Sequence, residues 1–307
     1  MLRENRVELD RLIYPLFVVP GEGVEREISS MPGQYNFSVD KTIDAAKEAW
    51  DLGIPSVILF GVPTAKDAVG SESWNPEGEV QRAIRGIKKA LPEMVVIADA
   101  CFCEYTDHGH CGVLKDGYLQ NDESLDNLAV QALSYAEAGV DIVAPSGMLD
   151  GFTLAVRTAL EEGDYPNVAI MAYSAKYSSA FYGPFRDAVD SAPQEGDRSA
   201  YQMDPANSAE AIREVNLDVQ EGADIVMVKP ALSYLDIIHA VREEVDLPVA
   251  AYNVSGEYAL LKAGAEKGWI DYDRAVMEVL TSIRRAGADL IITYHAKEMA
   301  RLLAKGR

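Results

Sequence analysis

The sequence has 307 residues, of which 48% are hydrophobic, so one large core can form without division of the chain into domains. Its 49 acidic residues against 28 basic ones leave a net charge of −21, which disfavours nucleic acids and anionic membrane surfaces as partners. No apolar leader and no run of about 18 apolar residues occurs, and we expect a cytoplasmic protein with a single domain, residues 1–307.

Eight short runs of β-branched and aliphatic residues predict buried parallel strands. The stretches between them space their apolar residues as amphipathic helices do. The predicted strands are 12–19, 56–60, 94–100, 141–144, 167–173, 224–228, 248–252 and 290–294, and the predicted helices include 40–52, 77–91, 124–138, 208–221, 234–245 and 271–286.

The junction from helix to strand repeats one pattern. In the segments 137–141, 221–224 and 285–289, a glycine suited to a helix C-terminus is followed by an aspartate and the next strand. Strands that alternate with helices predict an α/β fold, a (β/α)8 TIM barrel, with residues 1–11 as a short N-terminal arm. A doubly wound open sheet is the alternative, but no glycine-rich nucleotide fingerprint follows an early strand.

Two connections are much longer than the usual connection after a strand: 101–123 after the third strand and 174–207 after the fifth. Loops at this end of a barrel normally carry function. We therefore expect both to be active-site loops rather than linkers between domains.

The first long loop holds all three cysteines of the chain, Cys101, Cys103 and Cys111. Their clustering indicates metal or redox chemistry rather than a disulfide framework. Three thiolates can hold zinc with the fourth position open, as in catalytic sites, or His108 or His110 could close a structural site. Free reduced thiols are the third interpretation.

Two lysines are predicted to meet at the mouth of the barrel. Lys229 ends the sixth strand, where burial favours the neutral amine that attacks a carbonyl carbon to form a Schiff base. Lys176 follows the fifth strand, and because like charges at close range lower each other's pKa, the pair would activate whichever lysine stays neutral. Unrelated lysines at strand ends are the alternative interpretation.

The second long loop also carries Arg186, Arg198 and Gln202 beside the aromatic segment 181–185. A lid with guanidinium groups suits a substrate carboxylate, which arginine binds through two hydrogen bonds. Polar residues also lie at or just past the ends of other strands. Ser255 and Tyr294 are candidates for carboxylate binding. Asp99 and Ser146 are candidates for proton transfer or for anchoring a loop by hydrogen bonds.

Four motifs together resemble the porphobilinogen synthase, or 5-aminolevulinate dehydratase, family. They are Asp99-Ala-Cys-Phe-Cys103 through Gly112, Tyr173-Ser-Ala-Lys176 through Asp187, Val228-Lys229-Pro230 and Val254-Ser-Gly-Glu257, and the match runs from about Leu12 to the C-terminus. The resemblance implies a TIM barrel and a lyase that condenses two 5-aminolevulinate molecules into porphobilinogen with loss of two waters, in heme biosynthesis.

The resemblance also implies roles for individual residues. Lys229 would form the imine with one substrate, and Lys176 would engage the second as an imine or proton carrier. Zinc on the three cysteines would act on the second substrate. Asp99 and Tyr182 complete the catalytic set, and the implied substrate-binding residues are Arg186, Arg198, Gln202, Ser255, Tyr294, Ser146, Phe185 and Tyr252.

By the same resemblance, Glu214 would bind an allosteric magnesium and the chain would form a homo-octamer, although its N-terminal arm is short for the family. Two alternatives remain at this point. A class I aldolase-like barrel also uses a lysine imine on the sixth strand but needs neither the cysteines nor a second lysine. A scaffold protein with purely structural zinc would form no imine with a substrate.

Overall fold

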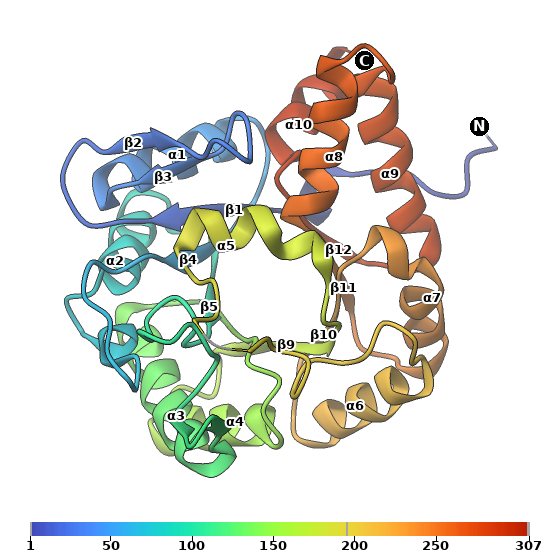
Figure 1. Cartoon of the computed structure of the whole chain (residues 1–307). Coiled ribbons are helices and arrows are strands. Elements are labelled where there is room, and N and C mark those ends of the chain that lie inside the picture. The colour runs from blue at the N-terminus through green and yellow to red at the C-terminus, as the bar shows by residue number, and fades with distance from the viewer. Residues whose placement is uncertain (1, 195, 306–307) are drawn as a thin grey trace.

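The computed structural model describes residues 2–194 and 196–305. Its centre is a closed ring of eight parallel strands in which each strand pairs with the next and the last pairs with the first, Leu12 opposite Ile291 (Figure 1). The predicted (β/α)8 TIM barrel is confirmed. The strands of the ring are β1 (Leu12–Val18), β4 (Ser56–Gly61), β5 (Val95–Ala100), β8 (Ile142–Pro145), β9 (Ala169–Lys176), β10 (Ile225–Lys229), β11 (Val249–Asn253) and β12 (Leu290–Thr293).

Helices surround the ring on its outer side (Figure 1). Gly139 follows the predicted helix 124–138, and Gly287 follows the predicted helix 271–286. Their φ angles are positive, 92° and 124°, as the repeated pattern of glycine at a helix end predicted. The helices are α1 (Val39–Asp51), α2 (Glu79–Ala90), α3 (Asn121–Ala138), α4 (Phe152–Glu162), α5 (Gly183–Val189), α6 (Ala209–Gln220), α7 (Leu235–Glu244), α8 (Ser255–Glu266), α9 (Tyr272–Ala286) and α10 (Ala296–Lys305).

Alternate residues of the strands supply two separate parts of the core. Ile58 and Ile97 belong to a cluster that fills the barrel, whereas Leu59 and Val96 belong to the larger cluster between strands and helices. Both faces of each strand are therefore apolar, which explains the continuous hydrophobic runs. None of the described helices is long and apolar enough to cross a membrane.

In the described part of the chain, two short hairpins and four short 3-10 helices lie outside the barrel strands. A hairpin of β2 (Glu25–Glu27) and β3 (Tyr35–Phe37) extends the sheet beside β1, and the third connection contains a second hairpin, β6 (Leu114–Lys115) and β7 (Tyr118–Leu119). Short 3-10 helices occur at η1 (Leu9–Arg11), η2 (Ser71–Trp74), η3 (Ala180–Tyr182) and η4 (Leu232–Tyr234). Residues 2–8 of the predicted arm contain no helix or strand.

The predicted bounds of the two long loops need correction. Strand β9 continues to Lys176, three residues past the predicted end, and α3 begins at Asn121, inside the predicted first loop. Ser174 and Lys176 are polar, so the apolar run stops early, yet both are buried where β9 pairs with β10. The second connection is also not a plain loop, because it contains η3 and α5, and α5 crosses the mouth of the barrel (Figure 1).

Candidate active site

The two predicted lysines meet at the mouth of the barrel. Lys176 and Lys229 are the last residues of neighbouring strands and stand opposite each other in the register of β9 and β10. Both side chains are buried, at 4% and 6% exposure. The Nζ atom of Lys176 donates to the carbonyl oxygen of Ser146 at 2.5 Å, and that of Lys229 lies 4.5 Å from the ring centre of Tyr252.

The surroundings give the two amines opposite character. Burial, together with the charge of Lys176, lowers the pKa of Lys229 to about 7. Burial acts in the same direction on Lys176, but the negative charges of the Cys111, Cys101 and Cys103 thiolates and of Asp99 outweigh it and raise its pKa. Lys229 is thus available as a neutral nucleophile near neutral pH, while Lys176 remains an ammonium group.

The three cysteines gather beside the lysines. The Sγ atoms of Cys101, Cys103 and Cys111 all lie within 4.8 Å of one another, and all three residues are buried. Among the described residues, neither candidate histidine completes the group: His108 accepts from the backbone N–H of His110 at 3.1 Å and contacts the carbonyl oxygen of Ala68. Three thiols with an open fourth position match the donor set of a catalytic zinc site rather than a closed structural one.

Two buried carboxyl groups adjoin the thiols. Ser146 donates to Asp99 at 3.1 Å, and burial raises the pKa of Asp99 to about 6. Glu104, which sequence reasoning missed, is 3% exposed, and burial raises its pKa to about 8. Its position directly after Cys103 was the available signal.

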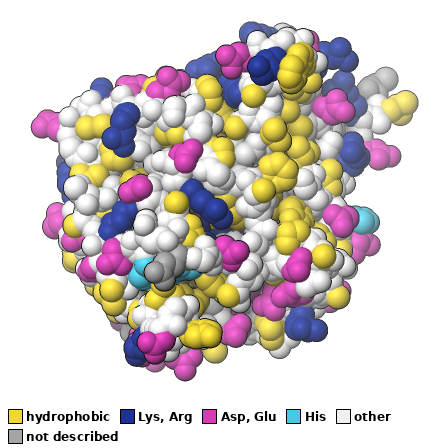
Figure 2. Space-filling model, in the orientation of Figure 1, with side chains coloured by type: hydrophobic (Ala, Val, Ile, Leu, Met, Phe, Trp, Pro, Cys, Tyr) yellow, Lys and Arg dark blue, Asp and Glu magenta, His cyan; other side chains and the backbone are white. Residues whose placement is uncertain are grey.

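A small cavity joins these groups into one site. It lies at the C-terminal ends of the strands, where the catalytic groups of TIM barrels are found. In Figure 2, side chains fill the centre that the ribbons of Figure 1 leave open. The cavity is lined by Phe60, Asp99, Cys101, Cys103, Glu104, Ser146, Lys176, Tyr182, Phe185, Arg198 and Lys229.

Of the two arginines in the second long connection, Arg198 lines this cavity. Arg198 donates to the carbonyl oxygens of Gly109 and Ser191 at 2.8 and 2.6 Å. Burial and the charge of Arg198 lower the pKa of Arg186. Within the described part of the chain, the Nε atoms of both arginines and the whole amide of Gln202 are buried without a hydrogen-bond partner. Such unsatisfied donors beside two positive charges suit an anionic ligand.

The hydroxyl groups proposed for the other carboxylate have protein partners here. Ser255 accepts from the backbone N–H of Phe185 at 2.9 Å and donates to the carbonyl oxygen of Phe181 at 3.3 Å. The hydroxyl groups of Tyr252 and Tyr294 are 2.8 Å apart. Tyr182 donates to the carbonyl oxygen of Tyr177 at 2.7 Å.

Comparison with known proteins decides the family. The family model described as delta-aminolevulinic acid dehydratase matches residues 1–302. The chain belongs to the delta-aminolevulinic acid dehydratase family. It is 60% identical to the delta-aminolevulinic acid dehydratase of Synechococcus elongatus and 55% identical to that of Bacillus subtilis, in each case over 99% of this chain and 94% of the relative.

Solved structures agree with this family membership. The chain is similar to the delta-aminolevulinic acid dehydratase of Toxoplasma gondii in complex with the reaction product porphobilinogen, with a TM-score of 0.98 and 46% identity over 100% of this chain and 88% of that one. An aldolase, QR15, matches 87% of this chain and 90% of its own with a TM-score of 0.50 and 13% identity, which shows a shared fold alone. This chain is therefore a dehydratase of the family, and the aldolase and scaffold alternatives are set aside.

Glu214 stands apart from the dehydratase cavity. It is a half-buried residue of α6, and burial with the charges of Asp150 and Glu210 raises its pKa. No group of three close metal-binding side chains includes it in the described ranges. The magnesium site therefore stays a prediction.

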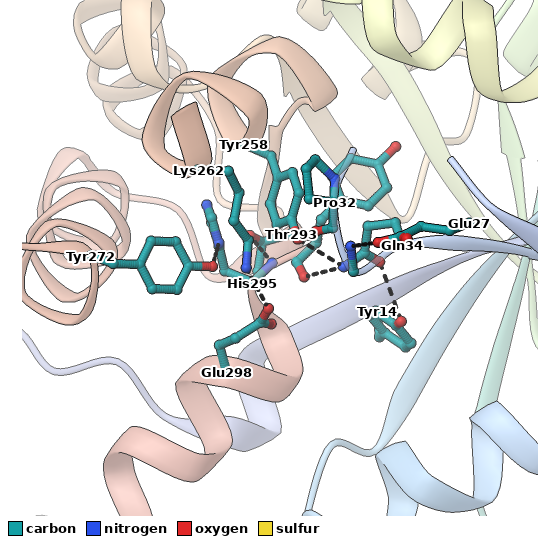
Figure 3. Close-up of polar contacts among 12 residues, drawn as sticks. Tyr14, Glu27, Pro32, Gln34, Tyr258, Lys262, Tyr272, Thr293, His295 and Glu298 are labelled. Carbon is teal, nitrogen blue, oxygen red and sulfur yellow. Dashed lines mark hydrogen bonds and ion pairs between the residues drawn. The ribbon is translucent and has the colours of Figure 1, made fainter. Parts of the chain in front are cut away.

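A polar network joins Gln34 to Tyr258 and to the backbone of Tyr294, and sequence reasoning missed it (Figure 3). Gln34, from the β2–β3 hairpin, donates to the backbone carbonyl of Tyr294 at 3.3 Å and to the hydroxyl of Tyr258 at 3.2 Å. The neighbouring His295 is fully buried against Tyr272, with 2.9 Å between Nδ1 and the hydroxyl. Nothing in the spacing of these residues signals their convergence.

Proposed function

We propose that this dehydratase joins two 5-aminolevulinate molecules into porphobilinogen, and that Lys229 binds the first of them as an imine. The observation that carries this proposal is the register pair of Lys176 and Lys229 in one cavity that Cys101 and Cys103 also line, with the thiol of Cys111 close to both. One ketone oxygen leaves as water when Lys229 forms the imine, and the other leaves when the amino group of one substrate forms the C–N bond with the remaining ketone carbon. The C–C bond then forms at the imine carbon and releases Lys229 as a free amine, so two waters are lost and the atoms balance.

In the proposed reaction, the neutral Lys229, the charged Lys176 and the carboxyl group of Asp99 have different roles. The neutral Nζ of Lys229 attacks the ketone carbon of the first substrate, and the carbonyl oxygen leaves as water. The ammonium of Lys176 would protonate the ketone oxygen of the second substrate, or, once it has given up a proton, its neutral amine would form a second imine. Asp99, whose Oδ1 atom has no partner among the described residues, would accept a hydrogen bond from the amino group of that substrate.

Two groups of residues would bind the carboxylates of the two substrates. Arg186, Arg198 and Gln202 would bind one carboxylate, because their buried donors lack partners in the described chain. Ser255 and Tyr294 would bind the other by exchanging their present partners for its oxygens. Phe185 and Tyr252 would pack on the first substrate, since both rings lie within 5.1 Å of the Lys229 Nζ atom, and Ser146 would hold Asp99 and Lys176 in place.

The three cysteines would hold zinc, since buried thiols with an open fourth position fit that ion. Zinc would supply a Lewis acid that polarises the carbonyl and orients the amine of the second substrate. Exhaustive chelation should abolish turnover, and added zinc should restore it. Full activity in protein shown to be free of metal would refute the zinc proposal.

Trapping tests the imine directly. The protein is incubated with 5-aminolevulinate, reduced with borohydride and mapped by mass spectrometry. We expect an adduct on Lys229, none on this peptide in K229M, and an unchanged adduct in K47M, which removes an exposed lysine of α1. A second adduct on Lys176 would identify two imines. Folded, zinc-loaded protein without any adduct would overturn the mechanism.

Two further expectations of the family belong to the proposal. Magnesium at Glu214 would act allosterically, and E214Q should lose any activation by added magnesium.

Assembly of subunits, into an octamer as the family implies, is supported by exposed apolar side chains on α8 and just past its end, where Leu260 and Trp269 are 59% and 77% exposed. Sedimentation of wild type and W269E tests this assembly, and a monomeric wild type would refute it.

A single domain and a cytoplasmic location complete the proposal. One barrel core extends through the described ranges, and the three cysteines carry free thiols, which persist in a reducing compartment. Limited proteolysis that released a stable fragment would contradict the single domain. Detection of the protein outside the cytoplasmic fraction of its cell would contradict the location.

A further inference from the structure

A second group of metal-binding atoms overlaps the three-cysteine group. One oxygen each of Asp99 and Glu104 and the Sγ atom of Cys101 lie within 4.8 Å of one another. All three residues are buried, with exposures of 7%, 3% and 2%. Cys101 therefore belongs to both groups.

An independent observation points to a ligand at this place. Ser146 occupies one oxygen of Asp99, while the other, Oδ1, is buried and has no hydrogen-bond partner among the described residues. Neither Asp99 nor Glu104 forms an ion pair in the described part of the chain, although both line the cavity. A buried carboxylate without a partner is costly, and a bound cation removes that cost.

The spacing also fits an ion. A tetrahedral metal bound about 2.3 Å from sulfur and about 2.1 Å from oxygen holds those ligand atoms about 3.6 Å apart. The three ligand atoms here lie within 4.8 Å of one another, so side-chain movement of about 1 Å or less brings them to that separation. A shared thiolate would place two ions at a separation like the roughly 3.5–4 Å of two-metal sites.

We propose that Asp99, Cys101 and Glu104 form a second metal subsite that shares the Cys101 thiolate with the three-cysteine site. Its mixed oxygen and sulfur donors select a borderline divalent ion such as zinc or cobalt rather than magnesium. The subsite goes beyond the proposed function. Because the ion would occupy Asp99 at the substrate position, excess zinc would inhibit the dehydratase in competition with substrate.

Metal counting tests the subsite without reference to activity. Reduced, folded protein is dialysed against increasing zinc with magnesium in excess, and bound zinc per chain is measured. Wild type should bind two zinc ions, the second more weakly, and E104Q should bind one. E93Q, which removes an exposed carboxylate at the opposite end of β5, should still bind two. Loss of the second ion in E214Q but not in E104Q would overturn the proposal.

Cobalt gives a second readout in the unmodified protein, so the test survives if E104Q fails to fold. The first equivalent should bring thiolate-to-cobalt absorption and an electron paramagnetic resonance signal. The second should lower the signal per cobalt, because a bridging thiolate couples the two ions. Saturation at one ion, or a signal that grows in proportion to cobalt, would refute the subsite. Absence of any bound ion would instead refute the zinc of the proposed function.

Discussion

At the scale of single residues, the two lysines of the cavity lie in different surroundings. Lys229 faces four aromatic rings, with its Nζ atom 4.5–5.2 Å from their centres, whereas Lys176 faces thiols, a carboxyl group and a backbone carbonyl. Burial and the charge of Lys176 lower the pKa of Lys229, and the negative charges of its neighbours raise the pKa of Lys176. Under the proposed function, Lys229 would act as the nucleophile and Lys176 as the acid.

This difference predicts the pH dependence of imine formation. Because the pKa of Lys229 is lowered to about 7, its neutral fraction, and with it the rate of borohydride trapping, should rise through about pH 7 and level off above that value. The probe is 4-oxopentanoate, a keto acid without an amino group, which isolates the first half-reaction. The rate is measured by mass spectrometry across the pH range.

Changing Lys176 checks the cause of the shift. Its positive charge lowers the pKa of Lys229, so K176M should move the midpoint to higher pH and slow trapping at pH 7. K176R keeps the charge and should leave the midpoint near that of wild type. An identical midpoint in K176M would show that the two lysines do not interact.

At the scale of elements, the site depends on how closely α5 and the chain before it pack on α8. Gly256 makes this approach possible, because a Cβ atom there would lie 2.5 Å from the carbonyl oxygen of Phe181. Ser255 and Asn36 add hydrogen bonds to the backbone of Phe185 and Ala188. The lid thus rests on contacts with backbone atoms, which depend little on the side chains of the lid itself.

Substitution of Gly256 should open the lid. In G256A the new methyl group forces the segment around Phe181 away from α8, so KM should rise several-fold and proteolysis within 177–203 should accelerate. G183A is the matched control, since nothing lies within 4 Å of a Cβ atom at that helical position. Equal proteolysis of the two variants would show that the close approach does not hold the lid.

At the scale of the whole molecule, the ring of strands fixes the relative positions of residues from distant parts of the chain. Asp99, Ser146, Lys176 and Lys229 come from four consecutive strands of the ring or the residues that follow them. Their convergence requires closure between β1 and β12 and a filled core on both faces of the strands. The site therefore depends on the stability of the barrel as a unit.

Removing a buried side chain from the core should lower the stability of the barrel. Leu59 of β4 is fully buried between strands and helices, and L59A should lower the free energy of unfolding by about 2–5 kcal/mol. Leu154 of α4 is 53% exposed, and L154A should change it by less than about 0.5 kcal/mol. Urea denaturation compares the two variants. Equal losses would mean that burial does not govern the difference.

The sequence by itself determined the eight strands, most of the helices, the two long connections and the chemical character of the three cysteines and two lysines. These features are local: apolar runs, helical spacing, glycine at helix ends and clustered thiols are visible within short segments. The bounds were least certain where polar residues are buried, and for this reason β9 was predicted to end before Lys176.

Only the tertiary structure decided which groups meet. Glu104 became a site residue because folding places its carboxyl group beside Cys101 and Asp99, and Gln34 contacts Tyr294 from 260 residues away. The same holds for the pKa of Lys229, since burial and the charge of Lys176 arise only when neighbouring strands pair. Distances between segments far apart in the chain, and the desolvation they produce, are properties of packing that no local pattern contains.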